Sequence, residues 1–207
     1  MDTPTRSWVI DRPVTSPFAL PRGLPGRLAG RFMRWTNRQS DLLGILGVRP
    51  GQRVLEVGYG PGALVRLLVE RTDAALIHGV DPSPVMREQA SAANRAAVRA
   101  GRVDLGLGSA QQTGLADHSV DLAVSVNNVA IWPDLHAGLR ELHRVVRPGG
   151  TLVIAWHGGT SPSRIARSLR LPEDKLGQID AALRDLFGTV SRHRTAGLDV
   201  FTATGQE

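Results

Sequence analysis

Several residue types are missing or scarce in this chain, and each shortage excludes a class of protein. Its 207 residues include no cysteine, which excludes disulfide scaffolds, cysteine-based zinc sites, iron–sulfur clusters and thiol catalysis. No metal site is expected from the remaining residues. No apolar run reaches the roughly 18 residues of a membrane-spanning helix. The first residues also lack the continuous apolar stretch of a secretory signal, so a cytoplasmic protein is expected.

Aromatic residues and lysine are also scarce. Aromatic side chains make up 4% of the chain, which leaves few rings to stack on nucleic-acid bases. Lys175 is the single lysine, so the net charge of +6 comes almost wholly from arginine. A basic chain attracts polyanions, but these arginines are spread along the whole sequence. Their excess is interpreted mainly as a compositional bias, and nucleic acid is not the expected partner.

The rest of the composition is that of a folded protein. Hydrophobic residues make up 42% and charged residues 21%, and the length suits one domain with modest additions. Residues 1–25 are rich in proline and predict an irregular arm. Apolar residues then recur at helical intervals up to Leu46, which predicts an amphipathic helix. Residues 1–46 are thus expected to form a lid beside the domain at 47–207.

From residue 53 onward, short apolar runs alternate with helical patterns. Such alternation predicts a parallel sheet with helices on both faces. The expected strands are 53–57, 75–80, 103–107, 120–126 and 151–156, and the expected helices are 61–71, 84–100 and 135–146. Ser83 before Pro84 is a good N-cap for the second of these helices.

The C-terminal end has a different pattern. After a helix around residues 176–187, two runs at 189–195 and 199–204 flank a tight turn, and strands joined in this way are antiparallel. The predicted fold is therefore α/β: a Rossmann-like, doubly wound and mostly parallel seven-stranded sheet with a C-terminal antiparallel hairpin.

The strongest candidate site is the segment 56–62, EVGYGPG, in which a strand runs into alternating glycines and then a helix. Glycine adopts positive φ and lets a ligand approach the backbone, and the helix start offers free N–H groups. Gly58, Gly60 and Ala63 fit a dinucleotide pattern weakly, whereas Glu56 and the three glycines fit acidic-x-G-x-G-x-G fully. A carboxylate at Glu56 would repel a pyrophosphate and suits an amino group or a sulfonium.

Asp81 stands at the end of the second strand, 19 residues after Gly62. A carboxylate at that point can accept hydrogen bonds from both hydroxyls of a ribose. The alternative is that Asp81 only caps the following helix, a task that Ser83 already fills.

Together with the segments 108–111 (GSAQ), 119–124 (SVDLAV), 132–134 (WPD) and 147–150 (RPGG), this series resembles the class I S-adenosylmethionine-dependent methyltransferases. The resemblance covers about residues 28–204. It implies that residues 47–207 bind S-adenosyl-L-methionine and transfer its methyl group.

The resemblance also implies roles for individual residues. The turn formed by Gly58, Tyr59, Gly60 and Gly62 would pass under the methionine part of the cofactor, which Glu56 would order. Asp81 would hold the ribose, Pro82 and Met86 would pack near the adenine, Ser109, Ala110 and Gln111 would flank it, and Val126 would lie near the sulfonium. Trp35, on the N-terminal helix, is either a cover for the methionine end or a core residue.

Four residues are candidates for catalysis. Methyl transfer from a sulfonium chiefly needs alignment of the acceptor, and a base helps only where the acceptor must lose a proton. His157 follows the fifth strand and is a candidate base or substrate contact, and His136 is a second candidate. Asn127 and Asn128, after the fourth strand, are candidates to orient the acceptor, although asparagine also favours turns.

The expected function is O-, N- or C-methylation of a small molecule. An RNA methyltransferase and a protein that binds the cofactor without methylating remain alternatives. Ser109 stands where the family often has an acidic residue, which predicts a somewhat lower affinity for the cofactor through its adenine. An Asn-Pro-Pro-Tyr sequence is absent, which disfavours exocyclic amines as acceptors. A homodimer is one option for the assembly.

Overall fold

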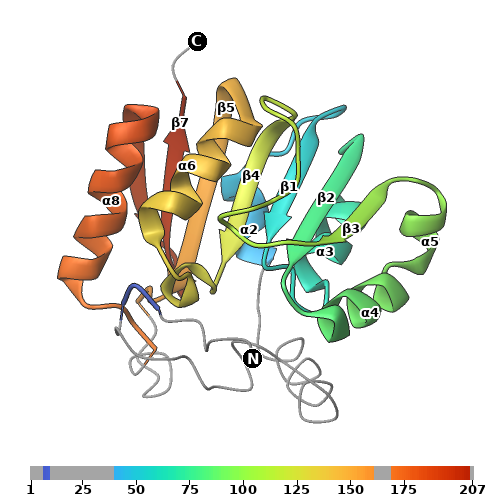
Figure 1. The fold of residues 1–207 in the computed structure, drawn as a ribbon, viewed down its shortest axis with the longest axis horizontal. Helices are drawn as coiled ribbons and strands as arrows, with labels where there is room; N and C mark the ends of the chain where they lie inside the picture. The colour runs from blue at the N-terminus through green and yellow to red at the C-terminus, as the bar shows by residue number, and fades with distance from the viewer. Residues whose placement is uncertain (1–6, 10–39, 161–168, 206–207) are drawn as a thin grey trace.

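A seven-stranded sheet runs through the centre of the molecule (Figure 1). The computed structural model describes residues 7–9, 40–160 and 169–205. The strands follow the order β3-β2-β1-β4-β5-β7-β6 across the sheet. Their bounds are β1 Arg53–Val57, β2 Leu76–Asp81, β3 Val103–Leu107, β4 Val120–Val126, β5 Val146–His157, β6 Thr189–Arg194 and β7 Leu198–Thr204.

The first five strands are parallel, and the last two are not. β3, β2, β1, β4 and β5 pair in parallel, β7 pairs antiparallel to β5, and β6 pairs antiparallel to β7. The carboxyl ends of the parallel strands therefore share one edge of the sheet, the lower edge in Figure 1. The predicted fold class is confirmed.

The described helices are α2 Ser40–Leu46, α3 Ala63–Arg71, α4 Pro84–Ala93, α5 Arg95–Arg99, the 3-10 helix η1 Val129–Ile131, α6 Leu135–Val145 and α8 Glu173–Phe187. Two of them, α4 and α6, begin at a side-chain N-cap. The Ser83 hydroxyl accepts a bond from the backbone N–H of Met86 at 3.3 Å, as expected of an N-cap. At the start of α6, Asp134 accepts a bond from the N–H of Ala137 in the same manner, at 2.9 Å.

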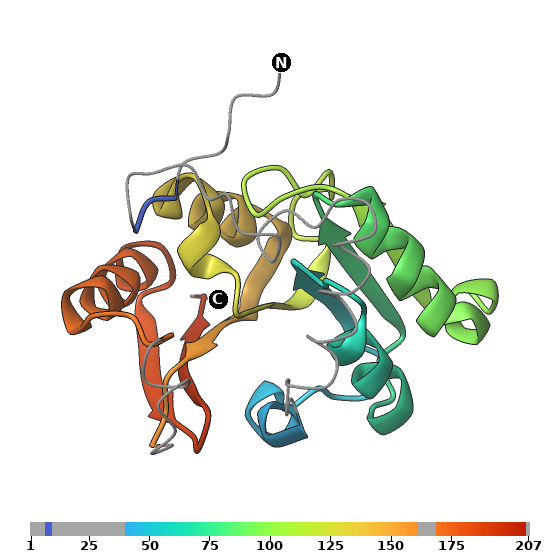
Figure 2. The ribbon, with the colours of Figure 1, turned by 90° about the horizontal axis from the view of Figure 1, so that it is seen from below.

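The sheet is covered on both faces, and each face has its own core. α6 and α8 lie on one side, whereas α2 and α3 lie on the other (Figure 2). The first core packs Leu139 and Leu183 of these helices against Ile154 of β5. The second packs Leu42 and Leu68 on the opposite face. Burial on both faces explains why the central strands are nearly continuous apolar runs.

Two predicted elements differ from those observed. The helix expected over 84–100 is divided at Asn94, whose side-chain amide bonds the carbonyls of Gly62 and Ala90. The fifth strand begins at Val146, five residues before the expected start, because Val146 pairs with Val120 across a shift in register. The division of the helix at Asn94 and the start of β5 at Val146 both depend on contacts with residues distant in sequence. The local sequence pattern therefore could not predict them.

Only the end of the helix expected over the N-terminal region is described. α2 contributes Leu42 and Leu46 to the second core, so this helix end packs on the sheet. The remainder of that expected helix, with Trp35, lies outside the described residues. Within the described ranges, no helix has the length and apolarity needed to cross a membrane.

Candidate functional site

The carboxyl edge of the sheet brings most of the predicted site residues together. Glu56 lies on β1, Asp81 ends β2, and Ser109, Ala110 and Gln111 follow β3. Val126 ends β4 and is followed by Asn127 and Asn128, and His157 ends β5. Residues far apart in the sequence thus share one edge (Figure 1) because parallel strands end there.

The glycine turn has the backbone that the sequence predicts. Gly58, Gly60 and Gly62 all have positive φ, at 70°, 52° and 78°. The N–H of Gly58 bonds the carbonyl of Val80 at 2.7 Å, which ties the turn to the end of β2. Gly62 is the N-cap of α3 and has no side chain to cap its free N–H groups. The first turn of α3 therefore presents its backbone N–H groups to this edge, and the one of Val65 bonds Glu56.

Glu56 is the most unusual side chain of the site. It is 2% exposed, and its Oε2 atom has no hydrogen-bond partner among the described residues. Burial and the neighbouring carboxylate of Asp81 raise the pKa of Glu56 well above its ordinary value, while a bond from the N–H of Val65 opposes this. A buried, unpaired acceptor is costly, so the arrangement fits a donor supplied by a ligand.

Asp81 is held in place by the backbone. Its Oδ2 accepts a bond from the N–H of Gly60 at 3.0 Å, and its Oδ1 accepts one from the N–H of Ser83 at 2.9 Å. Burial raises the pKa of Asp81 to about 6, although both bonds oppose the shift. Each carboxylate oxygen has two lone pairs, so one acceptor position on each oxygen is left for a ligand.

The loop after β3 lies next to Asp81. The N–H of Gly108 bonds the carbonyl of Asp81 at 3.2 Å. The backbones of Ser109 and Gln112 then exchange two hydrogen bonds in an isolated antiparallel β-bridge. This bridge closes the turn that contains Ala110 and Gln111. Ala110 is buried and Gln111 is half-buried.

The other residues expected around the nucleoside differ in exposure. Tyr59 is buried, its ring lies against Gly79, and its hydroxyl donates to the carbonyl of Gly106 at 3.1 Å. Met86 is 1% exposed and belongs to the second core, whereas Pro82 is exposed. Tyr59 and Met86 therefore also support the fold of the site.

Asn127 and Asn128 differ sharply in their surroundings. Asn127 is half-buried, has a φ of 57°, and donates its backbone N–H to Ala155. The side-chain amide of Asn128 is buried: its Oδ1 accepts bonds from Ser125 and Trp132, and its Nδ2 donates to the carbonyl of Val57 at 2.6 Å. This amide joins the end of β4 to the end of β1.

The two histidine candidates also differ. His157 is half-buried at the end of β5, its ring lies 5.5 Å from that of Trp156, and burial lowers its pKa. Burial thus favours the neutral form of this ring, which can accept a proton. His136 lies in the first turn of α6 and is exposed.

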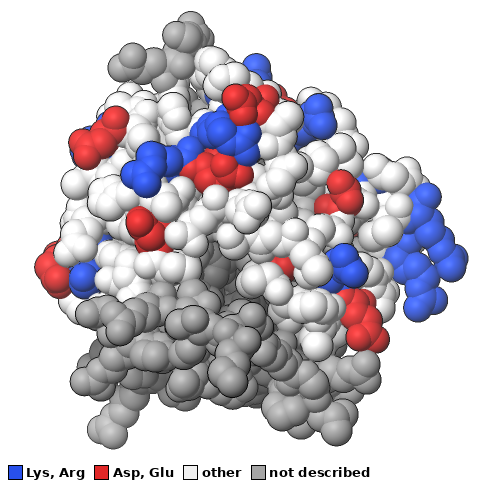
Figure 3. Space-filling view, in the orientation of Figure 1, with Lys and Arg blue, Asp and Glu red and all other residues white. Residues whose placement is uncertain are grey.

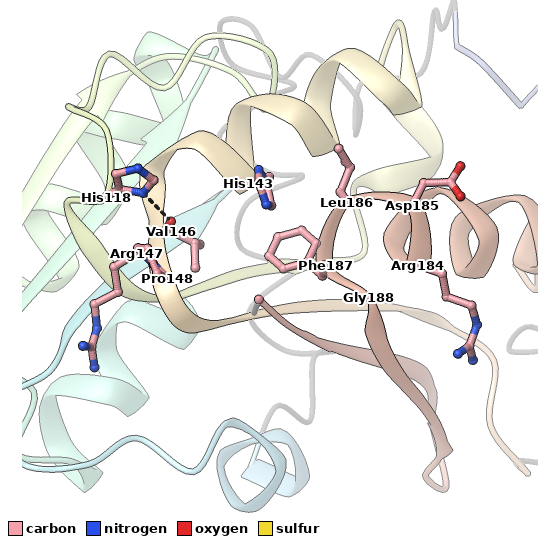
Figure 4. Close-up of a pocket in the computed structure, with 11 residues that line it drawn as sticks. His118, His143, Val146, Arg147, Pro148, Arg184, Asp185, Leu186, Phe187 and Gly188 are labelled. Carbon is pink, nitrogen blue, oxygen red and sulfur yellow. Dashed lines mark hydrogen bonds between the residues drawn. The ribbon is translucent and has the colours of Figure 1, made fainter. Parts of the chain in front are cut away.

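A pocket of about 410 Å³ opens at the opposite edge of the sheet, where α6 and α8 end (Figure 4). None of the predicted site residues lines it. Two of its basic residues have acidic partners: Arg147 pairs with Asp121 at 2.6 Å, and Arg184 pairs with Asp180 at 2.7 Å. The charges of these two arginines are therefore neutralised locally.

Three contacts of the site were not predicted from the sequence. Asn94, between α4 and α5, bonds the carbonyl of Gly62; Trp132 bonds Asn128; and Ser7 and Trp8 contact the turn after β4. Asn94 interrupts a helical run with a polar residue, which is a weak signal. The contacts of Ser7 and Trp8 span more than 120 positions and left no signal, and the bond of Trp132 to Asn128, four positions away, left none either.

Comparison with known proteins agrees with the fold. Residues 55–154 match the family model of a methyltransferase domain. The chain is 35% identical over 121 residues to the uncharacterized methyltransferase YdaC of Bacillus subtilis, covering 58% of this chain and 61% of YdaC. It is 34% identical over 157 residues to the uncharacterized methyltransferase Rv3342 of Mycobacterium tuberculosis, covering 73% and 60%. The chain thus spans about three fifths of the length of these relatives.

A solved structure extends the likeness in fold. The phosphoethanolamine N-methyltransferase 2 of Haemonchus contortus, in complex with S-adenosyl-L-methionine, superposes with a TM-score of 0.71 at 16% identity. The match covers 96% of this chain and 62% of that chain. The sheet order and the glycine turn define a Rossmann-like methyltransferase domain. The family match, the relatives and the fold together support assignment to the class I S-adenosylmethionine-dependent methyltransferases.

Proposed function

We propose that this protein binds S-adenosyl-L-methionine at the carboxyl edge of the sheet and transfers its methyl group to a small molecule. The observation that carries the proposal is the buried Oε2 of Glu56, which has no partner among the described residues. The ammonium group of a methionine is a donor of the opposite charge. A charge-assisted bond to it would offset the cost of burying that carboxylate.

The residues around Glu56 suit the other parts of the cofactor. The free acceptor positions of Asp81 suit the two ribose hydroxyls, and the positive-φ glycines leave the backbone open to close approach. Ser109, Ala110 and Gln111, with Pro82 and Met86, would border the adenine, and Val126 would border the sulfonium.

The bound cofactor would supply an activated methyl group. The protein would then mainly align the acceptor with that methyl group. His157 suits the role of base because burial favours its neutral form, and Asn127 adjoins the same edge. His136 is exposed and suits a contact with the outer part of an acceptor. For Asn128, its hydrogen bonds favour a positioning role over contact with the acceptor.

Charge pairing supports a small acceptor over a nucleic acid. Within the described ranges, six arginines form ion pairs with carboxylates: Arg66, Arg144, Arg147, Arg184, Arg192 and Arg194. Acidic and basic side chains are interleaved over α6 and α8, and basic ones gather mainly at the α5 end (Figure 3). A phosphate backbone favours a continuous basic face.

Thermal unfolding tests the cofactor. S-adenosylhomocysteine at 100 times its Kd should stabilise the protein by about 2.7 kcal/mol, whereas NAD at the same concentration should not. Stabilisation by NAD alone would contradict the interpretation of Glu56. Incubation of a cell extract with labelled S-adenosylmethionine then tests the acceptor: label in the small-molecule fraction supports the proposal. Label that RNase removes would support RNA, and saturated binding without transfer would support a protein that does not methylate.

A further inference from the structure

Two residues near the beginning of the chain, Ser7 and Trp8, donate three hydrogen bonds to the turn that follows β4. The Ser7 hydroxyl donates to the carbonyl of Ala130 at 2.5 Å, and the Trp8 indole Nε1 donates to the carbonyl of Val129 at 2.6 Å. The backbone N–H of Trp8 donates to the carbonyl of Trp132 at 3.0 Å. In Figure 1 this short segment, drawn in blue, lies at the carboxyl edge.

These bonds supply further donors to carbonyls of the turn, of which the Val129 carbonyl also accepts the N–H of Trp132 at 3.3 Å. η1 is a single turn, so most of its carbonyls have no partner within it. Ser7 and Trp8 supply donors to two carbonyls of η1 and to the carbonyl of Trp132, from more than 120 positions away in the sequence. Ser7 is 3% exposed, and Lys175 of α8 lies 5.2 Å from the centre of the Trp8 ring. The segment is therefore fixed on more than one side.

The same turn is bonded to the glycine turn. The indole Nε1 of Trp132, which follows η1, donates to the Oδ1 of Asn128 at 2.8 Å. The Nδ2 of Asn128 donates to the carbonyl of Val57, immediately before Gly58. A Cβ built on Gly58 would lie 2.3 Å from that Nδ2 atom, so the amide and the turn are in direct contact. One continuous series of bonds joins residues 7–9 to the glycine turn.

We propose that residues 7–9 are an N-terminal clasp that positions η1 and, through Trp132 and Asn128, the glycine turn. Ser7 and Trp8 are then positioning residues, which act on the cofactor without touching it. The inference rests on the proposed cofactor site. It adds that the cofactor site is complete only when residues 7–9 are bonded to η1. It also adds that these bonds fix the position of the chain that follows Asn127.

Trp8→Phe tests the clasp because it keeps an aromatic ring and removes the indole donor. We expect S-adenosylhomocysteine to bind about 3- to 10-fold more weakly by calorimetry, the size of effect that one hydrogen bond can produce. Amide hydrogen exchange should become faster in residues 127–132 and in 58–62. Trp156→Phe is the matched control, since it removes an indole bond to the carbonyl of Leu169 outside this series. It should change neither measurement.

Ser7→Ala provides a milder second variant, with Ser7→Thr as the conservative replacement that keeps the hydroxyl. Ser119→Ala is its control, because that hydroxyl bonds only the local carbonyl of Ala116. Ser7→Ala should accelerate exchange at both turns, and Ser7→Thr should restore protection. Unchanged affinity and exchange in Trp8→Phe and Ser7→Ala would overturn the clasp, and so would equal losses in the control variants. If the unaltered protein does not bind S-adenosylhomocysteine, the proposed function fails, whereas exchange still tests the clasp.

Discussion

At the scale of single residues, the site is defined by two buried carboxylates. Burial raises the pKa of both Glu56 and Asp81, so the folded protein binds protons more tightly than the unfolded chain does. For such groups the free energy of unfolding falls as pH rises through the raised pKa and recovers as pH is lowered. Both carboxylates therefore reduce the stability of the cofactor-free protein at neutral pH, which is typical of binding sites.

The substitution Glu56→Gln separates binding from stability. The neutral amide has the same shape and still accepts the bond from Val65, so the cofactor-free protein should unfold at a higher temperature at pH 8. The loss of the charge should weaken S-adenosylhomocysteine binding at least 10-fold, since bonds to charged groups contribute about 1.5–3 kcal/mol. Calorimetry and thermal unfolding measure the two effects. Glu70→Gln, on the exposed side of α3, is the control. A less stable Glu56→Gln protein with full affinity would contradict this account.

Asp81 predicts a pH dependence of binding. Its pKa is about 6 in the cofactor-free protein, and only the ionised carboxylate offers both free acceptor positions. The affinity for S-adenosylhomocysteine should therefore fall as pH is lowered from 7.5 through about 6 to 5. In Asp81→Asn the affinity should be low throughout, with a flatter profile. Calorimetry in matched buffers measures affinity against pH for the parent and for Asp81→Asn. Curves of the same shape for both proteins would show that Asp81 does not bind the cofactor.

At the scale of elements, the glycine turn and the end of β4 fit closely. Gly58→Ala would impose positive φ on alanine, at a cost of about 1–2 kcal/mol, and would press a Cβ against Asn128. Gly51→Ala is a matched control: its φ is 80°, but nothing lies within 4 Å of the new atom. In urea, Gly58→Ala should lose about 1–3 kcal/mol more than Gly51→Ala. Equal losses would show that the contact with Asn128 has no energetic weight.

A second contact between elements holds the loop after β3. Oε1 of Glu141, on α6, accepts bonds from the N–H and the hydroxyl of Thr113 at 2.9 and 2.6 Å, and its Oε2 accepts one from Arg144 at 2.8 Å. Arg144 first, and then Thr113, lower the pKa of Glu141 to about 2. The helix thus fixes a segment that continues from Ser109, Ala110 and Gln111.

Glu141→Gln should therefore destabilise the protein by about 1 kcal/mol at pH 7 in urea unfolding. Because the pKa of Glu141 is lower in the folded protein than in the unfolded chain, its ionised carboxylate stabilises the folded state at pH values above the unfolded pKa. This stabilisation is lost as pH falls through the folded pKa. The difference between variant and parent should accordingly shrink from pH 5 toward pH 3. A difference that is constant over this range would show that the charge of Glu141 is not responsible. Glu70→Gln, whose partner Arg66 is exposed, should change stability by less than about 0.5 kcal/mol.

At the scale of the whole molecule, the sequence predicted the sheet well because its central strands, such as β1 and β4, are buried on both faces. The bounds of β1, β3 and β4 agree with the expected runs, since a change from helical to continuous apolar pattern is a local signal. The edge that gathers Glu56 and Asp81 followed from parallel pairing alone. The family resemblance, carried by the same motifs, is confirmed by the match over residues 55–154.

The features that could not be predicted all depend on contacts between distant residues. Asn94 ends α4 through a bond to Gly62, and Val146 begins β5 by pairing with Val120. The buried amide of Asn128 bonds Val57, 71 positions away. Ser7 and Trp8 lie in a stretch whose prolines predicted only an irregular arm. Their partners are backbone carbonyls, which every residue carries, so no side-chain pattern could identify them.

The central claim is that the carboxylate of Glu56 receives the amino group of a sulfonium nucleoside at the carboxyl edge. A crystal structure with S-adenosylhomocysteine tests it most directly. The account predicts the methionine ammonium within about 3 Å of Glu56 Oε2 and both ribose hydroxyls on Asp81. A nucleoside bound at the opposite edge, or one whose amino group lies away from Glu56, would contradict it.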